Sequence, residues 1–377
     1  MHTVKNCLKL QLSLLLAIAC TSCQSSSPVA TTTTPMESRV DTRLVLNNAV
    51  LEQSNKQENT VWKIKADNIV YSEDKKTAVL DRVVGNLLQN GEIILKISSG
   101  KGEIRDNGNI VILEDRIVAS DPRNGSVMRS NSIEWRPQEN LLLIKDKLNA
   151  VHPKLEVNAS QGKYYTNTEI LEIEGDVSAD TAEPTARLKS DRLLWQIQQN
   201  LVTSPNPIKV VRYNRDRKVT ERLTSDRAEL DLLAQTATLN GNIELISLEP
   251  KIQAASESLV WNYQQRVGKT DSPIQIVDRE RQITVTGNRG ELDLPQQIAT
   301  LKQGAKGINQ AQPSQLYANQ LMWRIDTETI EALGNVIYEQ TDPPARLTGE
   351  KAIGTLGNNN ITVTSNGKQQ VTSIIDR

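Results

Sequence analysis

Residues 256–261 read Ser-Glu-Ser-Leu-Val-Trp, and variants of this frame recur throughout the chain. Each copy opens with a small residue and ends, five positions later, on an anchor, which is Trp135, Trp195, Trp261 or Trp323 in the strongest copies. Weaker copies bring the anchors to ten, at residues 71, 104, 135, 164, 195, 230, 261, 292, 323 and 354. Their spacings of 33, 31, 29, 31, 35, 31, 31, 31 and 31 residues are too regular for chance and are typical of a repeat protein.

The local pattern within one repeat is that of β-strands. Apolar and polar residues alternate in Ala228–Leu232 and in Gly290–Leu294, as half-buried strands require. About eleven residues past the anchor stands a glycine beside Asn or Asp, as at Gly175, Gly241 and Gly334, which we interpret as a turn. The sequence therefore predicts an elongated, all-β stack of about ten repeats of roughly 31 residues, with two strands each and about twenty strands in all.

The residue inventory excludes most kinds of active site. The chain has 377 residues, a net charge of −1 and two histidines, and its three cysteines all lie within the first 23 residues. Zinc sites, thiol nucleophiles and Ser-His-Asp triads need residues that the rest of the chain largely lacks. A balanced charge also argues against a nucleic-acid partner. We therefore predict no catalytic residue, no metal, no cofactor and no enzymatic activity, and we interpret His152 as a loop residue.

The first residues have the character of an export signal. Lys5 and Lys9 precede an apolar stretch at Leu10–Ala19, which is too short for a comfortable membrane span. Small residues before Cys20 fit cleavage with a lipid attached to its thiol, so we predict a signal peptide over residues 1–19 and a periplasmic, membrane-anchored lipoprotein. A plain cleaved signal or a short uncleaved anchor is the alternative. Residues 20–40 are rich in Ser, Thr and Pro and are predicted to be a flexible tether.

The longest anchor spacing, the 35 residues between Trp195 and Leu230, departs most from the period. It contains Ser204-Pro-Asn-Pro207 and the charged run 212–222, so we place a seam near residues 212–220. The seam divides the chain into modules 41–212 and 213–377, or else is only a longer loop in a continuous stack. We interpret the charged run as a solvated loop, with attraction of anionic headgroups as the alternative.

The anchors define the expected interior. Large apolar side chains at this period fill the core of the stack, and they also form the wall of an apolar groove if the stack is open along one side. The candidate groove residues are Trp62, Tyr71, Ile104, Trp135, Tyr164, Trp195, Leu230, Trp261, Leu292 and Trp323.

Three segments carry a resemblance to a known family. They are Leu44-Val-Leu-Asn-Asn-Ala-Val, then Thr60-Val-Trp62-Lys-Ile-Lys-Ala-Asp-Asn-Ile-Val-Tyr71, then Ala78-Val-Leu-Asp-Arg-Val83. Together with Ser130-Asn-Ser-Ile-Glu-Trp135 they resemble LptC, the periplasmic component of the lipopolysaccharide-export ABC transporter, over residues 40–210. The doubled length is similar to the cyanobacterial long form, and the related OstA/LptA bridge proteins share the pattern.

The resemblance implies an OstA/LptC-like β-jellyroll whose open groove binds the acyl chains of lipopolysaccharide and passes it from the inner-membrane transporter toward the outer membrane. It also implies edge-to-edge docking: the transporter's periplasmic domains at Leu44 and Leu46, and an LptA/OstA-like or LptD-like component at Ile361 and Val363. Two alternatives stay open, an LptA/OstA-type bridge protein and a structural β-repeat surface lipoprotein without a transport role. A closed interior favours the structural protein, and an open apolar groove favours transport. Whether the two modules share one groove is left open by the sequence.

Overall fold

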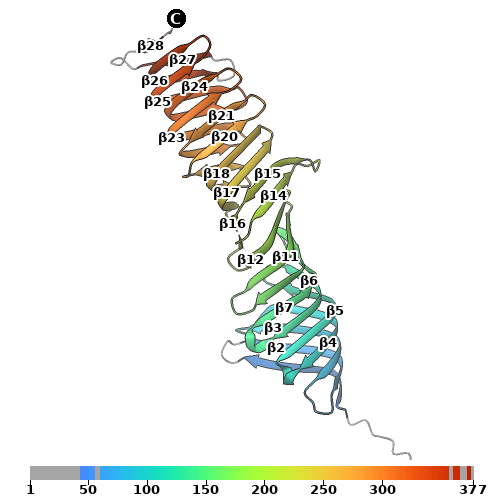
Figure 1. The fold of residues 1–377 in the computed structure, drawn as a ribbon. Helices are drawn as coiled ribbons and strands as arrows, with labels where there is room; N and C mark the ends of the chain where they lie inside the picture. The colour runs from blue at the N-terminus through green and yellow to red at the C-terminus, as the bar shows by residue number, and fades with distance from the viewer. Residues whose placement is uncertain (1–42, 56–59, 356–359, 366–371, 375–377) are drawn as a thin grey trace, which may run out of the picture. The chain divides into compact units, whose positions relative to one another are not determined.

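The computed structural model describes residues 43–55, 60–355, 360–365 and 372–374 (Figure 1). Within these ranges the chain forms 28 strands that pair into one sheet, with two short 3-10 helices, η1 (Asp106–Gly108) and η2 (Pro137–Glu139). The predicted all-β fold is thereby confirmed. The predicted signal peptide, the tether and Cys20 lie outside the described residues.

The first fourteen strands are β1 (Val45–Asn55), β2 (Thr60–Tyr71), β3 (Ala78–Gln89), β4 (Glu92–Arg105), β5 (Ile110–Asp121), β6 (Ser126–Arg136), β7 (Leu141–Asp146), β8 (Leu148–His152), β9 (Leu155–Ala159), β10 (Gln161–Tyr165), β11 (Ile170–Thr181), β12 (Ala186–Gln196), β13 (Leu201–Ser204) and β14 (Ile208–Tyr213). The others are β15 (Val219–Ser225), β16 (Arg227–Asp231), β17 (Thr236–Leu248), β18 (Lys251–Asn262), β19 (Val267–Thr270), β20 (Ile274–Asp278), β21 (Ile283–Gly287), β22 (Arg289–Asp293), β23 (Ile298–Asn309), β24 (Ser314–Arg324), β25 (Thr329–Gln340), β26 (Ala345–Thr355), β27 (Asn360–Thr364) and β28 (Thr372–Ile374).

Paired strands are antiparallel. Each long strand runs through both halves of the sheet, and its pairing register shifts at the point where it crosses from one half to the other. In β11 the pairing with β12 runs from Ile170 to Glu174, shifts register, and resumes from Val177 to Thr181. The same shift recurs in β5, β17, β23 and β25. Elsewhere the crossing between halves divides the strand, as between β19 and β20. Two long strands per repeat are therefore confirmed, and the total exceeds twenty because some strands are divided.

The repeating glycines lie at these crossings, so their predicted place in turns between strands is wrong. Gly175, Gly241 and Gly334 stand inside β11, β17 and β25 at the register shifts. Gly175 and the following Asp176 have φ of 81° and 48°, a conformation that glycine adopts at little cost and that aspartate tolerates. The glycines thus form β-bulges that carry one strand from one half to the other.

The small residue that opens each frame lies on the strand next to the bulge, and it stabilises the backbone where the register shifts. Five such residues are serines whose hydroxyls donate a hydrogen bond to the carbonyl two residues further on, at 2.7 to 3.3 Å. They are Ser99, Ser130, Ser190, Ser225 and Ser256. A short polar side chain is needed here because the backbone bends where the ladder is interrupted.

The ten anchors lie in a single cross-strand row, which we call the aromatic row. Successive Cα partners along it are Tyr71, Ala78, Ile104, Val111, Trp135, Leu142, Tyr164, Leu171, Trp195, Val202, Leu230, Ala237, Trp261, Gly268, Leu292, Ala299, Trp323, Ile330, Gly354 and Ile361. Large rings stand next to smaller residues: a Cβ on Gly268 would lie 2.7 Å from the Trp261 ring. The repeat period in the sequence is therefore the spacing of successive anchors along the aromatic row.

A second row runs through the other half of the sheet, and we call it the aliphatic row. Its successive partners are Leu51, Ile64, Gly85, Ile97, Ala119, Met128, Ala150, Val157, Ala179, Leu188, Val210, Leu223, Leu245, Ala254, Ile276, Val285, Gly307, Leu316, Tyr338 and Leu347. Side chains of the two rows pack against each other in one hydrophobic core that extends from Trp62 to Val363.

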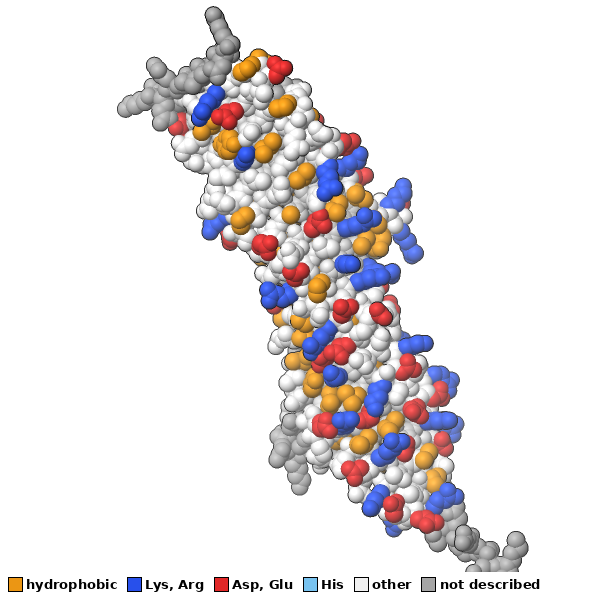
Figure 2. Space-filling view, in the orientation of Figure 1, with side chains coloured by type: hydrophobic (Ala, Val, Ile, Leu, Met, Phe, Trp, Pro, Cys, Tyr) orange, Lys and Arg blue, Asp and Glu red, His pale blue; other side chains and the backbone are white. Residues whose placement is uncertain are grey.

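The outward positions of the strands are mostly polar, although exposed valines such as Val79 and Val260 also occur there. Across β11 and β12, Arg192 lies 3.4 Å from Glu174, and across β19 and β22, Lys269 lies 3.2 Å from Glu291. On the face shown in Figure 2, basic and acidic side chains are interspersed along the strands. Opposite charges thus neighbour each other on this face, in keeping with the near-zero net charge of the chain.

Pairing continues through the predicted seam. β14 pairs with β15 and β13 pairs with β16, so strands on both sides of residues 212–220 belong to the same sheet. Residues from Arg43 onward also form one compact unit. The division into modules 41–212 and 213–377 stays a prediction.

Candidate apolar binding pocket

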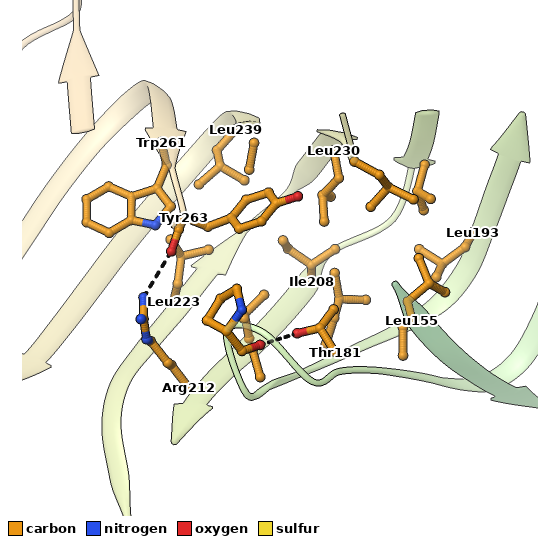
Figure 3. A pocket seen from close by; sticks show the side chains of 18 of the residues that line it. Leu155, Thr181, Leu193, Ile208, Arg212, Leu223, Leu230, Leu239, Trp261 and Tyr263 are labelled. Atoms are coloured by element: carbon orange, nitrogen blue, oxygen red, sulfur yellow. Dashed lines mark hydrogen bonds between the residues drawn. The ribbon is translucent and has the colours of Figure 1, made fainter. Parts of the chain in front are cut away.

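An apolar pocket lies between the two rows in the middle of the described chain (Figure 3). The aromatic row contributes Trp195, Leu230 and Trp261, and the aliphatic row contributes Leu223 and Leu245 among others. The cavity has a volume of about 130 Å³, and the side chains around it come from strands between β9 and β18. An engineered apolar cavity of about 150 Å³ stays dry and binds benzene, so this space accepts an apolar group of similar size.

The pocket coincides with the longest anchor spacing. Ile208 pairs with Ser225 across the β14–β15 hairpin, and Ile274 pairs with Gly287 across the corresponding β20–β21 hairpin two repeats later. The first hairpin is four residues longer, which accounts for the anchor spacing of 35 in place of 31. The charged run is therefore mostly strand: only residues 214–218, at the hairpin tip, lie outside β14 and β15.

Polar groups stand at the edge of this apolar lining. Arg212 donates a hydrogen bond from Nη1 to the carbonyl oxygen of Tyr263 at 3.0 Å, which joins the end of β14 to the turn after β18 (Figure 3). The buried carboxylate of Glu221 accepts a hydrogen bond from Arg266 Nε at 2.6 Å and lies 4.0 Å from Arg212 Nη1. Burial lowers the pKa of Arg212, while Glu221 raises it and Arg266 lowers it further. The mouth of the pocket thus carries two arginines around one carboxylate.

Most of the predicted groove residues are core residues. Trp62, Trp135, Tyr164, Trp195, Trp261, Leu292 and Trp323 are buried, and Tyr71, Ile104 and Leu230 are partly buried. Trp62 and Trp135 pack together with ring centroids 5.0 Å apart. Trp195, Leu230 and Trp261 line the pocket, and Trp261 and Leu292 also line a smaller neighbouring void. The structure brings three of the ten together at one site.

Sequence reasoning misses several pocket residues. The aliphatic row, with Leu188, Val210 and Leu223, has no tryptophan landmark, and its members are identified only through strand pairing. The interpretation of Arg212 and Glu221 as part of a solvated loop is wrong, since Glu221 is 5% exposed and the Arg212 side chain 22% exposed. The only signal in the sequence is the irregular anchor spacing, which falls at the pocket.

His152 is the last residue of β8, so its interpretation as a loop residue is wrong, and it makes an aromatic contact beside the pocket. Its ring lies edge-on to Trp195 at 5.3 Å between centroids, and burial together with Lys154 lowers its pKa. Among the described residues, no group of three or more His, Cys, Asp or Glu side chains is placed to hold a metal ion.

The predicted docking residues lie at both ends of the described sheet. Leu46 is in β1, which pairs only with β2 among the described strands, and Leu44 precedes it with its carbonyl accepting a hydrogen bond from the Tyr71 amide at 2.9 Å. Ile361 and Val363 are in β27, which pairs only with β26 there. In the part of the chain that the structure places, no helix has the length and apolar character needed to cross a membrane.

The two rows and the pocket between them define a β-repeat protein with an apolar interior and a polar exterior. The chain belongs to the family described as lipopolysaccharide-assembly, LptC-related, whose sequence model matches residues 10–143 and 208–310. As a member of this family of transport proteins, it has a role in lipopolysaccharide transport at the cell envelope. The second matched stretch begins at the first residue of β14.

Among solved structures, the chain is similar to LptH from Pseudomonas aeruginosa, described as the LptA-homologous periplasmic component of the lipopolysaccharide transport device. The sequence identity is 14%, the TM-score is 0.27, and the likeness covers 33% of this chain and 87% of LptH. No curated protein sequence matches the chain.

Proposed function

We propose that the protein binds acyl chains of lipopolysaccharide between its aromatic and aliphatic rows and passes the lipid from the inner-membrane transporter toward the outer membrane. The observation that carries the proposal is the apolar pocket between Trp195, Leu223 and Trp261, because a cavity among well-packed repeats is space that the fold itself does not fill. Family membership supports the same lipid.

The size of the pocket indicates how binding proceeds. A volume of about 130 Å³ holds a short piece of chain, so a whole acyl chain enters only if the two rows move apart beside it. Each buried methylene contributes about 0.8 kcal/mol, which offsets the weaker packing between the separated rows. The chain's contribution is passive, and the energy for directed movement comes from the transporter's ATPase.

Photo-crosslinking at two adjacent residues of one strand tests this proposal. Leu230 lines the pocket, whereas Glu229 in the same strand β16 is exposed on the opposite face. With a photoreactive residue at position 230 or 229 and purified lipopolysaccharide as the probe, we expect adducts at 230 and none at 229. Equal yields at both positions, or none at either, would contradict the lipid-binding role and leave a structural β-repeat protein.

The two ends of the sheet are proposed to dock partner strands. The outer edges of β1 and β27 have no partner strand among the described residues, and unpaired N–H and C=O groups are templates for strand addition. We propose that Leu44 and Leu46 contact the transporter, that Ile361 and Val363 contact an LptA/OstA-like or LptD-like component, and that Cys20 carries a lipid anchor. Lysine at Leu46 should reduce co-purification of the transporter only, and lysine at Ile361 that of the other component only.

A further inference from the structure

Among the described residues, three ion pairs link the two halves of the sheet near the ends of their strands. They are Arg123–Glu169 at 2.6 Å, Glu221–Arg266 at 2.6 Å and Arg281–Glu328 at 2.7 Å. Glu169, Arg266 and Glu328 each stand five positions past an anchor and have a positive φ. Each also immediately precedes a strand that contributes to the aromatic row, namely β11, β19 or β25. The paired residues are 45 to 47 positions apart in sequence, so the three contacts are similar, but Glu221 lies within β15 whereas Arg123 and Arg281 lie in hairpin turns.

The first and third of these ion pairs each belong to an acid–base–acid cluster. Arg123 lies between Asp121 at 2.7 Å and Glu169, and Arg281 lies between Asp278 at 2.8 Å and Glu328. The hydrogen bonds from the arginines to these carboxylates raise the pKa of both arginines. In both clusters the negative charges exceed the positive ones.

The cluster at the pocket has bases at the two positions where the other clusters have acids. Arg212 occupies the repeat position of Asp121 and Asp278, because each of these residues is four positions past an isoleucine that pairs with the opening residue of a frame. Arg266 likewise occupies the position of Glu169 and Glu328, and Glu221 stands between the two arginines. A base–acid–base arrangement leaves one positive charge in excess at the edge of the apolar pocket described above.

The excess charge is poorly satisfied by the protein. Among the described residues, the guanidinium of Arg212 donates one hydrogen bond, to the Tyr263 carbonyl, and its nearest carboxylate is 4.0 Å away. Guanidinium has five N–H donors in a planar fork that matches carboxylate and phosphate oxygens. Lys154 adds a further cation, since its ammonium donates to the carbonyl of Leu232, a pocket residue, at 2.9 Å.

We propose that Arg212 and Arg266 form a seat for the anionic headgroup, a phosphate or a carboxylate, of the lipid whose chain occupies the pocket. The inference rests on the proposed function and adds to it the headgroup charge that the site selects and the place where that headgroup sits. In the absence of lipid, Glu221 holds Arg266, and the incoming anion takes over donors of both arginines.

Binding of three probes to the purified full-length chain tests the seat. The probes are dodecyl phosphate and dodecyl maltoside below their micellar concentrations, and inorganic phosphate alone. We expect dodecyl phosphate to bind at least tenfold more tightly than dodecyl maltoside, because a charge-assisted hydrogen bond supplies such a factor. Inorganic phosphate should bind more weakly than dodecyl phosphate. Binding of inorganic phosphate as tight as that of dodecyl phosphate would overturn the headgroup seat in favour of a free-anion site.

Matched variants separate the seat from a structural contact. Arg212→Gln should weaken dodecyl phosphate binding about tenfold and leave the affinity for dodecyl maltoside unchanged. Arg281→Gln, in the acid–base–acid cluster away from the pocket, should change neither affinity. Glu221→Gln should tighten dodecyl phosphate binding, because it removes the competing carboxylate, and a merely structural ion pair would instead give weaker or unchanged binding. Equal affinities for both amphiphiles that are insensitive to Arg212→Gln would overturn the seat while the apolar groove stands. Binding of neither amphiphile would overturn both proposals.

Discussion

Replacing one alanine by leucine in two equivalent repeats tests whether the pocket is real space. Ala237 and Ala299 occupy the same place in the aromatic row, next to Trp261 and Trp323. Ala237 lines the pocket and is 8% exposed, whereas Ala299 is fully buried at 0% and lines none of the cavities described above. The two substitutions are chemically identical, so their difference reports the local packing.

The magnitudes follow from burial and overpacking. Leucine adds three carbon atoms, and burying them in existing space at Ala237 contributes about 2 kcal/mol. At Ala299 the same atoms have no space, and overpacking costs about 1 to 3 kcal/mol. Ala237→Leu should therefore be more stable than Ala299→Leu by about 3 to 5 kcal/mol.

The assay is guanidinium unfolding of both variants and the parent, followed by titration with dodecyl maltoside. Ala237→Leu should keep or raise the unfolding midpoint and weaken dodecyl maltoside binding, because the new side chain occupies the ligand's space. Ala299→Leu should lower the midpoint and leave the affinity of the folded protein unchanged. Equal losses of stability in the two variants would refute the existence of an unfilled pocket at residue 237.

Three further predictions concern stability. Arg123→Ala should cost about 3 kcal/mol in chemical unfolding, because it leaves the buried carboxylates of Asp121 and Glu169 without a counter-charge; a loss below about 1 kcal/mol would contradict it. The pKa of His152 is lowered in the folded state, so the unfolded state binds more protons and stability should fall as the pH drops below about 6.5. His152→Gln should reduce that slope in unfolding measured at several pH values. Gly241→Ala should lose about 1 to 2 kcal/mol at the β17 bulge, where φ is 80°, and an unchanged midpoint would argue against the bulge.

The repeat pattern predicted the fold because it records one physical constraint many times. Each anchor must pack beside its neighbour in the aromatic row, so the spacing of Trp135, Trp195, Trp261 and Trp323 follows from strand length and sheet pairing. Alternation then fixes which face is buried. These constraints act locally and periodically, and a single sequence displays them.

Other features depend on pairing that the sequence does not display. Glycine followed by Asp or Asn, as at Gly175, is favoured both by a turn and by a bulge, since both need positive φ. Arg266 and Glu221 are 45 residues apart, one and a half repeats, so their contact forms only when the two halves are packed together. The charged run resembles a loop because longer hairpin strands and a loop have the same polar composition.

We infer that function in this repeat protein is located where the regularity fails. Elsewhere the residues of the two rows pack closely, as Ala299 beside Trp323 illustrates, and two acid–base–acid clusters, around Arg123 and Arg281, link the ends of the two halves. The repeat with the longest anchor spacing departs from this in two ways, with the apolar pocket between the rows and a base–acid–base cluster beside it. A longer hairpin alone does not require a reversed charge, and a reversed charge alone does not create a cavity. That the two departures coincide around Arg212 is the reason to assign them to one ligand, with an apolar chain and an anionic head, rather than to two unrelated irregularities of packing.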